Sequence, residues 1–195
     1  MELKSNVEFI LTVPLPSNDR FPLILIDEFM KQLLNNTNGG LYICMSCKEW
    51  ATVMKSFEDN EGHWSSTIIW LKNCFVLSQK DYHSKYEPIL YGWKEGNKIE
   101  HFKDRTRDDV WEFNKPSNNK LHPTMKPIEL CAKAIQNSSK QGDIVLDLFG
   151  GSGSTLIAAH QLKRKCLMME LDTQYCQVII NRWEKLTGEK SEVLR

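Results

Sequence analysis

The chain has 195 residues, with 25 Lys or Arg and 25 Asp or Glu, so its formal net charge is zero. This length predicts one compact domain with a substantial core. Zero net charge gives no basis for a general electrostatic affinity for polyanions, so contact with nucleic acid would have to come from local clusters. The chain lacks the run of roughly 20 apolar residues that a membrane span requires, and this predicts no membrane contact.

Short apolar strands alternate with helical patterns along the first half of the chain. The expected elements are a strand at 8–12, a helix at 26–34, a strand at 41–45, a helix at 48–57 and strands at 67–71 and 88–92. Alternation of this kind predicts an α/β fold with three layers, in which helices cover both faces of a mostly parallel sheet.

The second half continues the alternation. It predicts a helix at 129–139, a strand at 144–148, a further strand at 166–169 and a last helix at 173–186 that ends at Gly188. Apolar side chains recur at near-helical intervals in the last helix, at Tyr175, Val178, Ile179, Trp183 and Leu186. This periodicity predicts that the helix packs on the core.

The most informative motif joins the strand at 144–148 to the helix that follows it. The strand is continuously apolar, as is typical of a parallel strand covered on both faces. It leads into Gly150, Gly151 and Gly153, which allow a sharp turn and a close approach of the backbone to a ligand. Glu170 follows about 20 residues later, after the next strand, where an acid can accept hydrogen bonds from ribose hydroxyls. The motif therefore predicts a nucleotide-cofactor pocket.

Three cofactor classes use such a loop. A Walker loop is excluded because Ser154 and Thr155 follow Gly153 without a lysine. A dinucleotide fingerprint is weak because its third glycine would fall at Leu156. Asp147, just before the loop, places a carboxylate where it could face a positive centre, and this favours S-adenosylmethionine. The alternative is a tight strand-to-helix connection without a ligand.

The segment before this helix and strand carries a family resemblance. The residues His122-Pro123-Thr124-Met125-Lys126-Pro127 resemble the segment that precedes the cofactor loop in the beta class of DNA amino-methyltransferases. The Trp-x-Lys-Asn and Tyr-Glu-Pro-x-x-Tyr-Gly-Trp-Lys patterns of the first half are also similar to that family. The resemblance implies a Rossmann-like S-adenosylmethionine-dependent methyltransferase fold in circularly permuted motif order. It implies methyl transfer from S-adenosylmethionine to the exocyclic amine of adenine or cytosine in DNA, with adenine the commoner target.

The permuted order divides the predicted single domain, residues 1–195, into a target-base half at 1–93, a DNA-contact loop at 94–121 and a cofactor half at 122–195. In the family, the segment with Thr124 and Lys126 lies over the methionine end of the cofactor, where a hydroxyl and an ammonium can hold a carboxylate. Phe149 would pack beside the adenine ring. The predicted cofactor-binding residues are Thr124, Lys126, Asp147, Phe149, Gly150, Gly151, Ser152, Gly153, Thr155 and Glu170.

The target-base motif departs from the family. After the first strand, such enzymes carry Asp-Pro-Pro-Tyr, whose polar side chain orients the amine and whose ring stacks on a flipped base. Val13, Pro14, Leu15 and Pro16 stand at these positions, so only Pro14 matches. Without stacking and hydrogen bonds, the cost of base flipping, a few kcal/mol, is not offset. The nearby 17–19 segment could lend an acceptor by folding back; the alternative is a catalytically inactive or truncated methyltransferase-like protein that binds S-adenosylmethionine or DNA without turnover.

The remaining predictions concern partners and location. Lys94, Lys103, Arg105 and Arg107 are interleaved with aromatic residues and are the candidate DNA contacts, although nearby acids nearly cancel their charge and also fit a solvated loop. A homodimer would enlarge the DNA-contact surface. The Cys44-x-x-Cys47 pair lacks a second pair, which argues against zinc. The other cysteines, at 74, 131, 166 and 176, are expected to be buried thiols, consistent with a reducing cytoplasm.

Overall fold

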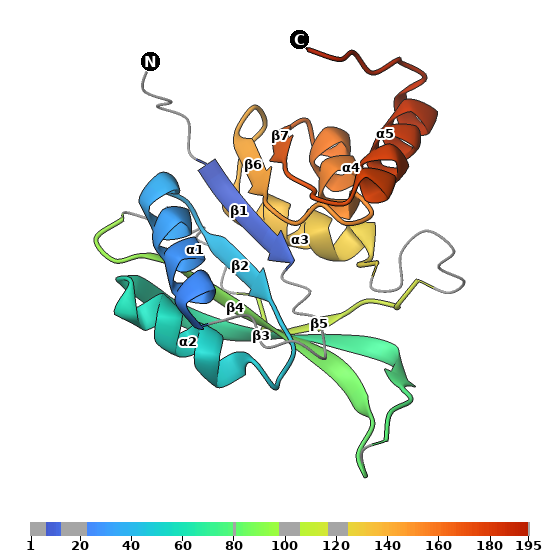
Figure 1. The fold of residues 1–195 in the computed structure, drawn as a ribbon. Helices are drawn as coiled ribbons and strands as arrows, with labels where there is room; N and C mark the ends of the chain where they lie inside the picture. Colours follow the sequence, from blue (N-terminus) through green and yellow to red (C-terminus); the bar gives the residue numbers. More distant parts are fainter. Residues whose placement is uncertain (1–6, 13–22, 80, 98–105, 117–124, 195) are drawn as a thin grey trace.

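The computed structural model describes residues 7–12, 23–79, 81–97, 106–116 and 125–194 (Figure 1). Its elements in chain order are β1 (Val7–Thr12), α1 (Leu23–Asn36), β2 (Leu41–Cys44), α2 (Trp50–Asp59), β3 (Gly62–Val76), β4 (Ser84–Lys94), β5 (Val110–Glu112), α3 (Ile128–Ser138), β6 (Ile144–Asp147), α4 (Ser154–Gln161), β7 (Lys165–Met168) and α5 (Thr173–Thr187).

One seven-stranded sheet runs through the molecule in the order β5-β3-β4-β2-β1-β6-β7. β1 pairs in parallel with both β2 and β6, β6 pairs in parallel with β7, and β3 with β5. Only β4 is antiparallel to its neighbours, β2 and β3. The sheet is therefore mostly parallel, and it joins strands from both predicted halves of the chain.

Helices cover both faces of this sheet, so the predicted three-layer α/β fold is confirmed (Figure 1). Successive side chains of a strand point to opposite faces. In β2, Leu41 and Ile43 pack with α1 and α2, whereas Tyr42 and Cys44 pack with α3 and α4. Burial on both faces explains why the central strands are continuously apolar instead of alternating.

The sequence did not predict one strand, and it underestimated the length of two others. β5 lies inside the segment 94–121 that was predicted to be a loop, and it pairs with β3. Three residues are too few to give a periodic pattern. Trp111, one of the aromatic residues interleaved with the candidate DNA contacts, is buried in the core. β3 and β4 run beyond the predicted strands at 67–71 and 88–92 as a long hairpin that projects from the body (Figure 1).

The last helix is less buried than its periodicity predicts. Only Ile179 is fully buried, and Leu186 is 44% exposed. The reason is position, since α5 packs against α4 at the outer end of the layer and has no helix beyond it (Figure 1). Gly188 ends α5 in the left-handed conformation, as predicted.

The cysteines divide into three groups by exposure. Cys44 and Cys131 are buried, Cys166 and Cys176 are half-buried, and Cys47 and Cys74 are exposed. The expectation of a buried thiol is therefore wrong for Cys74, because β3 carries it out along the hairpin, past the helices.

No helix in the described parts of the chain has both the length and the apolar composition needed to cross a bilayer. Those same parts contain no group of three potential metal ligands.

Candidate active site

The glycine loop lies where the topology favours a ligand. β1 is followed by α1 on one face of the sheet, and β6 is followed by α4 on the other face (Figure 1). The carboxyl ends of these two adjacent parallel strands therefore form a topological switch point, at which connections leave in opposite directions and a crevice opens. The loop 148–153 follows β6 at this crevice.

The loop is shaped by two of its glycines. Gly151 has φ of 51° and Gly153 has φ of 79°, both in the left-handed region that disfavours side chains. Gly150 contributes in a different way, because a Cβ there would lie 2.7 Å from the Met168 sulfur, so the absence of a side chain lets the loop pack closely on β7. The predicted role of these glycines in turning the chain agrees with the geometry, and the close approach of the backbone to a ligand stays a prediction.

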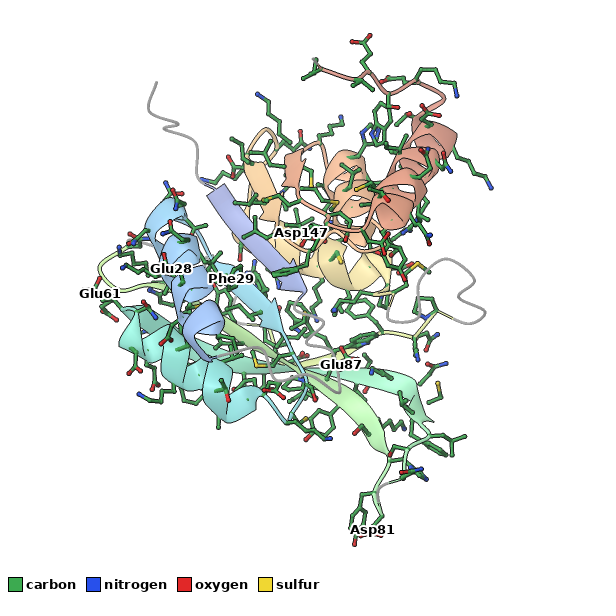
Figure 2. All side chains as sticks on the ribbon, viewed as in Figure 1. Glu28, Phe29, Glu61, Asp81, Glu87 and Asp147 are labelled. Carbon is green, nitrogen blue, oxygen red and sulfur yellow. The ribbon has the colours of Figure 1, made fainter. Side chains whose placement is uncertain are left out.

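Asp147 holds the first turn of the loop from inside the protein (Figure 2). Its side chain is buried, with 1% exposed. The Phe149 backbone N–H donates to Asp147 Oδ1 at 3.0 Å. Burial raises the pKa of Asp147 to about 6, and hydrogen bonds from Thr155 and Phe149 and the charge of Lys126 oppose that rise. The carboxylate thus orders the loop, and direct contact with a positive centre remains a prediction.

Glu170 links the end of β7 to the glycine loop. Gly151 N–H donates to Glu170 Oε2 at 2.6 Å, and Asp172 N–H donates to Oε1 at 2.9 Å. Each carboxylate oxygen therefore takes one backbone donor and has further acceptor capacity. The sequence predicted that these residues come together, and the structure places them in direct contact.

Lys126 and Thr155 lie around the start of α4. Ser154 Oγ donates to the Lys126 carbonyl oxygen at 2.8 Å, which ties the 125–127 segment to the helix. Thr155 and Ser152 are buried beside Asp147 and within the loop. The structure therefore groups Lys126, Ser152 and Thr155 with the loop, as predicted.

Two neighbours of the loop were not predicted. Arg182 of α5 donates from Nη1 to the Ser152 carbonyl oxygen. Phe29 of α1 meets the Phe149 ring edge-on, with ring centroids 5.5 Å apart (Figure 2). Arg182 lies between the apolar positions of its helix and reads as an ordinary surface arginine, and an aromatic contact across 120 residues leaves no local pattern. Neither could be identified from sequence periodicity.

Some predicted site residues lie outside the described parts of the chain. They are Thr124 of the cofactor set, Val13, Pro14, Leu15 and Pro16 of the target-base motif, and Lys103 and Arg105 of the DNA-contact set.

The structure does not bring the two described DNA-contact candidates to the crevice. Lys94 ends β4, which is antiparallel to β2, so it lies at the edge where the parallel strands begin. Its ammonium donates to Asn35 Oδ1 at 2.6 Å. Arg107 donates to the Asn137 carbonyl at the end of α3, away from Lys126. Because both lie at the opposite edge from the glycine loop, their assignment to the same DNA-facing site is not supported.

The residues present fit a nucleoside with a positive centre. Glu170 can accept hydrogen bonds from hydroxyl groups. Asp147, at the end of β6, supplies negative charge, and Lys126, tied to the start of α4, supplies positive charge. A phosphate-binding site would instead need a basic residue within the loop, and residues 148–153 contain none. The geometry therefore favours the cofactor class that the sequence predicted.

Comparisons with known proteins agree with this fold and site. The family model described as DNA methylase matches residues 23–182. The type II methyltransferase M.HpaI of Haemophilus parainfluenzae is 29% identical over 167 residues, covering 74% of this chain and 53% of the relative. The type II methyltransferase M.Cfr9I of Citrobacter freundii is 32% identical over 157 residues, covering 72% and 50%. The chain thus spans about half the length of these two relatives.

A solved structure matches more completely. The crystal structure of the M1.HpyAVI–SAM complex superposes with a TM-score of 0.77 at 25% identity, covering 93% of this chain and 89% of that one. The family model covers well over half of the sequence and includes every strand of the sheet except β1, together with the glycine loop. The chain therefore belongs to the DNA methylase family of amino-methyltransferases.

Proposed function

We propose that this protein transfers a methyl group from S-adenosylmethionine to the exocyclic amine of adenine, or of cytosine, in DNA. The carrying observation is the hydrogen bond from Gly151 to Glu170, which joins the glycine loop and the end of β7 into one nucleoside-sized cradle. The matching M1.HpyAVI structure, solved with SAM, supports the same cofactor for this chain.

Each residue of the cradle has a proposed task. Glu170 accepts hydrogen bonds from the ribose, the Phe149 ring packs beside the adenine, and Lys126 with Thr124 holds the methionine carboxylate. Asp147 keeps the loop in shape and adds negative charge near the cationic end. When bound, S-adenosylmethionine supplies an activated methyl group on a sulfonium sulfur.

The strand order suggests which half of the chain binds the target base and which binds the cofactor. Residues 1–93 would carry the target base, because β1 ends beside the cofactor loop, and residues 122–195 would carry the cofactor. We further propose that the protein acts in the cytoplasm, as a part of a restriction–modification or related DNA methylation system. A homodimer would add DNA-contact surface, since Lys94 and Arg107 lie at the wrong edge to provide it.

The test is direct. The protein is incubated with isotopically labelled S-adenosylmethionine and unmethylated DNA, and the label is sought on adenine and on cytosine. Label on either amine is expected, with loss of both labelling and calorimetric cofactor binding in Glu170→Ala. Glu189→Ala, which removes an exposed carboxylate after α5, is the matched control and should behave as wild type.

The alternative of binding without turnover depends on the tetrapeptide Val13 to Pro16. Cofactor binding with no labelled base, under conditions where a known DNA methyltransferase works, would replace our proposal with that alternative. In that case the combined change Val13→Asp, Leu15→Pro and Pro16→Tyr should restore labelling if the rest of the crevice is intact.

A further inference from the structure

A buried ion pair lies on the sheet outside the cofactor cradle. The Lys72 side chain on β3 is only 4% exposed, and its ammonium donates to Glu87 Oε1 on β4 at 2.5 Å. The ammonium is also 4.9 Å from the centroid of the Trp70 ring. A buried ion pair gains little net stability, because desolvation offsets the attraction between the charges. Its presence therefore invites a functional explanation.

The register of the sheet places Glu87 at the end where the crevice opens. Cys44, the last residue of β2, is opposite Ile89, so Glu87 lies two residues beyond the end of β2 on the same face (Figure 2). Glu87 is opposite Trp70, which positions it diagonally from Lys72. It therefore projects past β2 on the face covered by α3.

Electrostatic contacts place Glu87 near the cofactor cradle. Burial raises the pKa of the Cys44 thiol to about 11, and the charges of Lys126, Glu87 and Asp147 all act on the same thiol. Lys126 and Asp147 are cradle residues, and both lie close enough to Cys44 to influence it. Together with the register, this places Glu87 on the same side of the sheet as Lys126 and Asp147, toward β4 and away from Glu170.

One oxygen of Glu87 is available to a partner from outside. Lys72 occupies Oε1, and within the described stretches Oε2 accepts no hydrogen bond. The Glu87 side chain is 35% exposed, so an external N–H donor can reach it. The amine of a target base needs such an acceptor, and none of the side chains of Val13, Pro14, Leu15 and Pro16 can supply one.

We propose that Glu87, held in place by Lys72, is the carboxylate that orients the exocyclic amine of the target base. This inference rests on the proposed methyl-transfer function. An amine N–H donates to Glu87 Oε2, and this hydrogen bond turns the nitrogen lone pair toward the methyl group. The Lys72 ammonium fixes the carboxylate in position, so that no reorganisation is needed during the reaction.

The Glu87 carboxylate also accepts the proton that the amine loses during methylation. As the nitrogen lone pair forms the new N–CH3 bond, the S–CH3 bond breaks and its electron pair stays on sulfur, which becomes a neutral thioether. The nitrogen then carries a positive charge and loses one proton to Glu87 Oε2. The proton passes from there to water, since Glu87 is partly exposed, and the carboxylate is regenerated.

The first test is the Glu87→Gln variant, which keeps size and shape but removes the negative charge. Lys72 donates to the amide oxygen in this variant, so the NH2 group, which cannot accept a hydrogen bond, faces the target base. Glu87→Gln should lower kcat about 100-fold, as expected when one preorganised polar group is lost, with an unchanged calorimetric Kd for S-adenosylmethionine. The double variant Lys72→Met with Glu87→Met removes the acceptor without leaving an unpaired ammonium buried, and it should show the same loss. Asp59→Asn is the matched control, because Asp59 forms an exposed pair with Lys55 on α2, and it should retain wild-type kcat.

A binding measurement separates orientation from a structural role. The methylated site is first located by sequencing wild-type reaction products, and duplexes are then made with the target adenine replaced by purine, which lacks the amine (for a cytosine target, with the corresponding base lacking its amine). Wild type should prefer the base with the amine about tenfold, a difference of one hydrogen bond to a charged group, and Glu87→Gln should lose this preference. A merely structural pair would leave the preference intact.

The outcomes are distinct. Full kcat in Glu87→Gln, or an unchanged preference for the amine, overturns the role of Glu87 and leaves the methyl-transfer function standing. Absence of labelled DNA with the wild-type protein overturns both. Loss of kcat and of preference together, with cofactor Kd and unfolding midpoint preserved, supports the inference.

Discussion

The cofactor half and the target half of this protein share one sheet but differ in how their sites are built. In the cofactor half, the strand, glycine loop and acid of one motif contact each other directly, as in the bond between Gly151 and Glu170. In the target half, β1, β2 and β4 provide the same framework, but the tetrapeptide after β1 lacks the polar and aromatic groups of the family. The framework of a site and its chemistry are therefore encoded separately, and substitutions can test each half alone.

The largest effect is expected at Glu170. Glu170→Ala removes the acceptor for two backbone N–H groups and for the ribose, so both loop order and ligand contacts are lost. Charge-assisted hydrogen bonds contribute about 2 kcal/mol each, which predicts roughly 10³-fold weaker S-adenosylmethionine binding. Isothermal titration calorimetry measures it. An affinity within fivefold of wild type would show that the ligand does not use this cradle.

The next effect concerns Asp147 and pH. Its pKa of about 6 lies above the ordinary value of 3.8, so the folded protein holds a proton that the unfolded chain has already lost. Stability from this group is present at low pH and is lost as pH rises from about 4 to about 6. Asp147→Asn, which keeps an acceptor for the Phe149 N–H, should therefore gain up to about 3 kcal/mol on wild type across that window. Urea unfolding at several pH values measures the difference, and a pH-independent difference would contradict it.

Substitutions at two glycines, one in each half, compare how tightly the two halves are packed. A Cβ at Gly92 in β4 would meet the His63 backbone carbonyl oxygen closer than van der Waals contact allows, and it would lie 2.9 Å from the Phe57 ring. Backbone in a sheet cannot easily move, so Gly92→Ala should reduce the free energy of unfolding by about 2 kcal/mol. Gly150→Ala is the matched change in the cofactor half, and it meets the flexible Met168 side chain. Its loss in a denaturant titration should be smaller, and equal losses would contradict this ranking.

Local patterns account for most of what could be predicted. Short apolar runs and the glycine loop identified β1, β2, β6, β7 and their helices, and in β2 and β6 the run is continuous because both faces are buried. The grouping of Asp147 and Glu170 with the glycine loop followed from the motif, and that of Lys126 followed from the family resemblance. β5 was missed because three residues carry no periodicity, and the exposure of Cys74 was missed because hairpin length depends on distant packing.

The same limitation explains why the ion pair was not predicted. Lys72 and Glu87 are 15 residues apart, and the family-like patterns that contain them do not indicate that the two side chains pair. Their contact depends on the antiparallel register of β3 and β4, which no local pattern specifies. The basic residues of the segment 94–121 led to a prediction that the structure does not support. Composition does not indicate which edge of a sheet a lysine occupies, and Lys94 and Arg107 lie at the edge opposite the glycine loop.

The smallest effect is expected from the two basic residues at the far edge of the sheet. Lys94 is bonded to Asn35 and Arg107 to the Asn137 carbonyl, both away from the crevice. A DNA duplex whose target base reaches the end of β1 would not contact that edge of the same subunit. Lys94→Ala and Arg107→Ala should therefore change DNA affinity less than twofold, which is under about 0.5 kcal/mol. Fluorescence anisotropy at two salt concentrations measures it, since a phosphate contact would reduce the salt dependence of binding. A clear loss of affinity with a smaller salt slope would mean that DNA is bound at this edge, which a second subunit could achieve by presenting its far edge to DNA held at the first subunit's crevice.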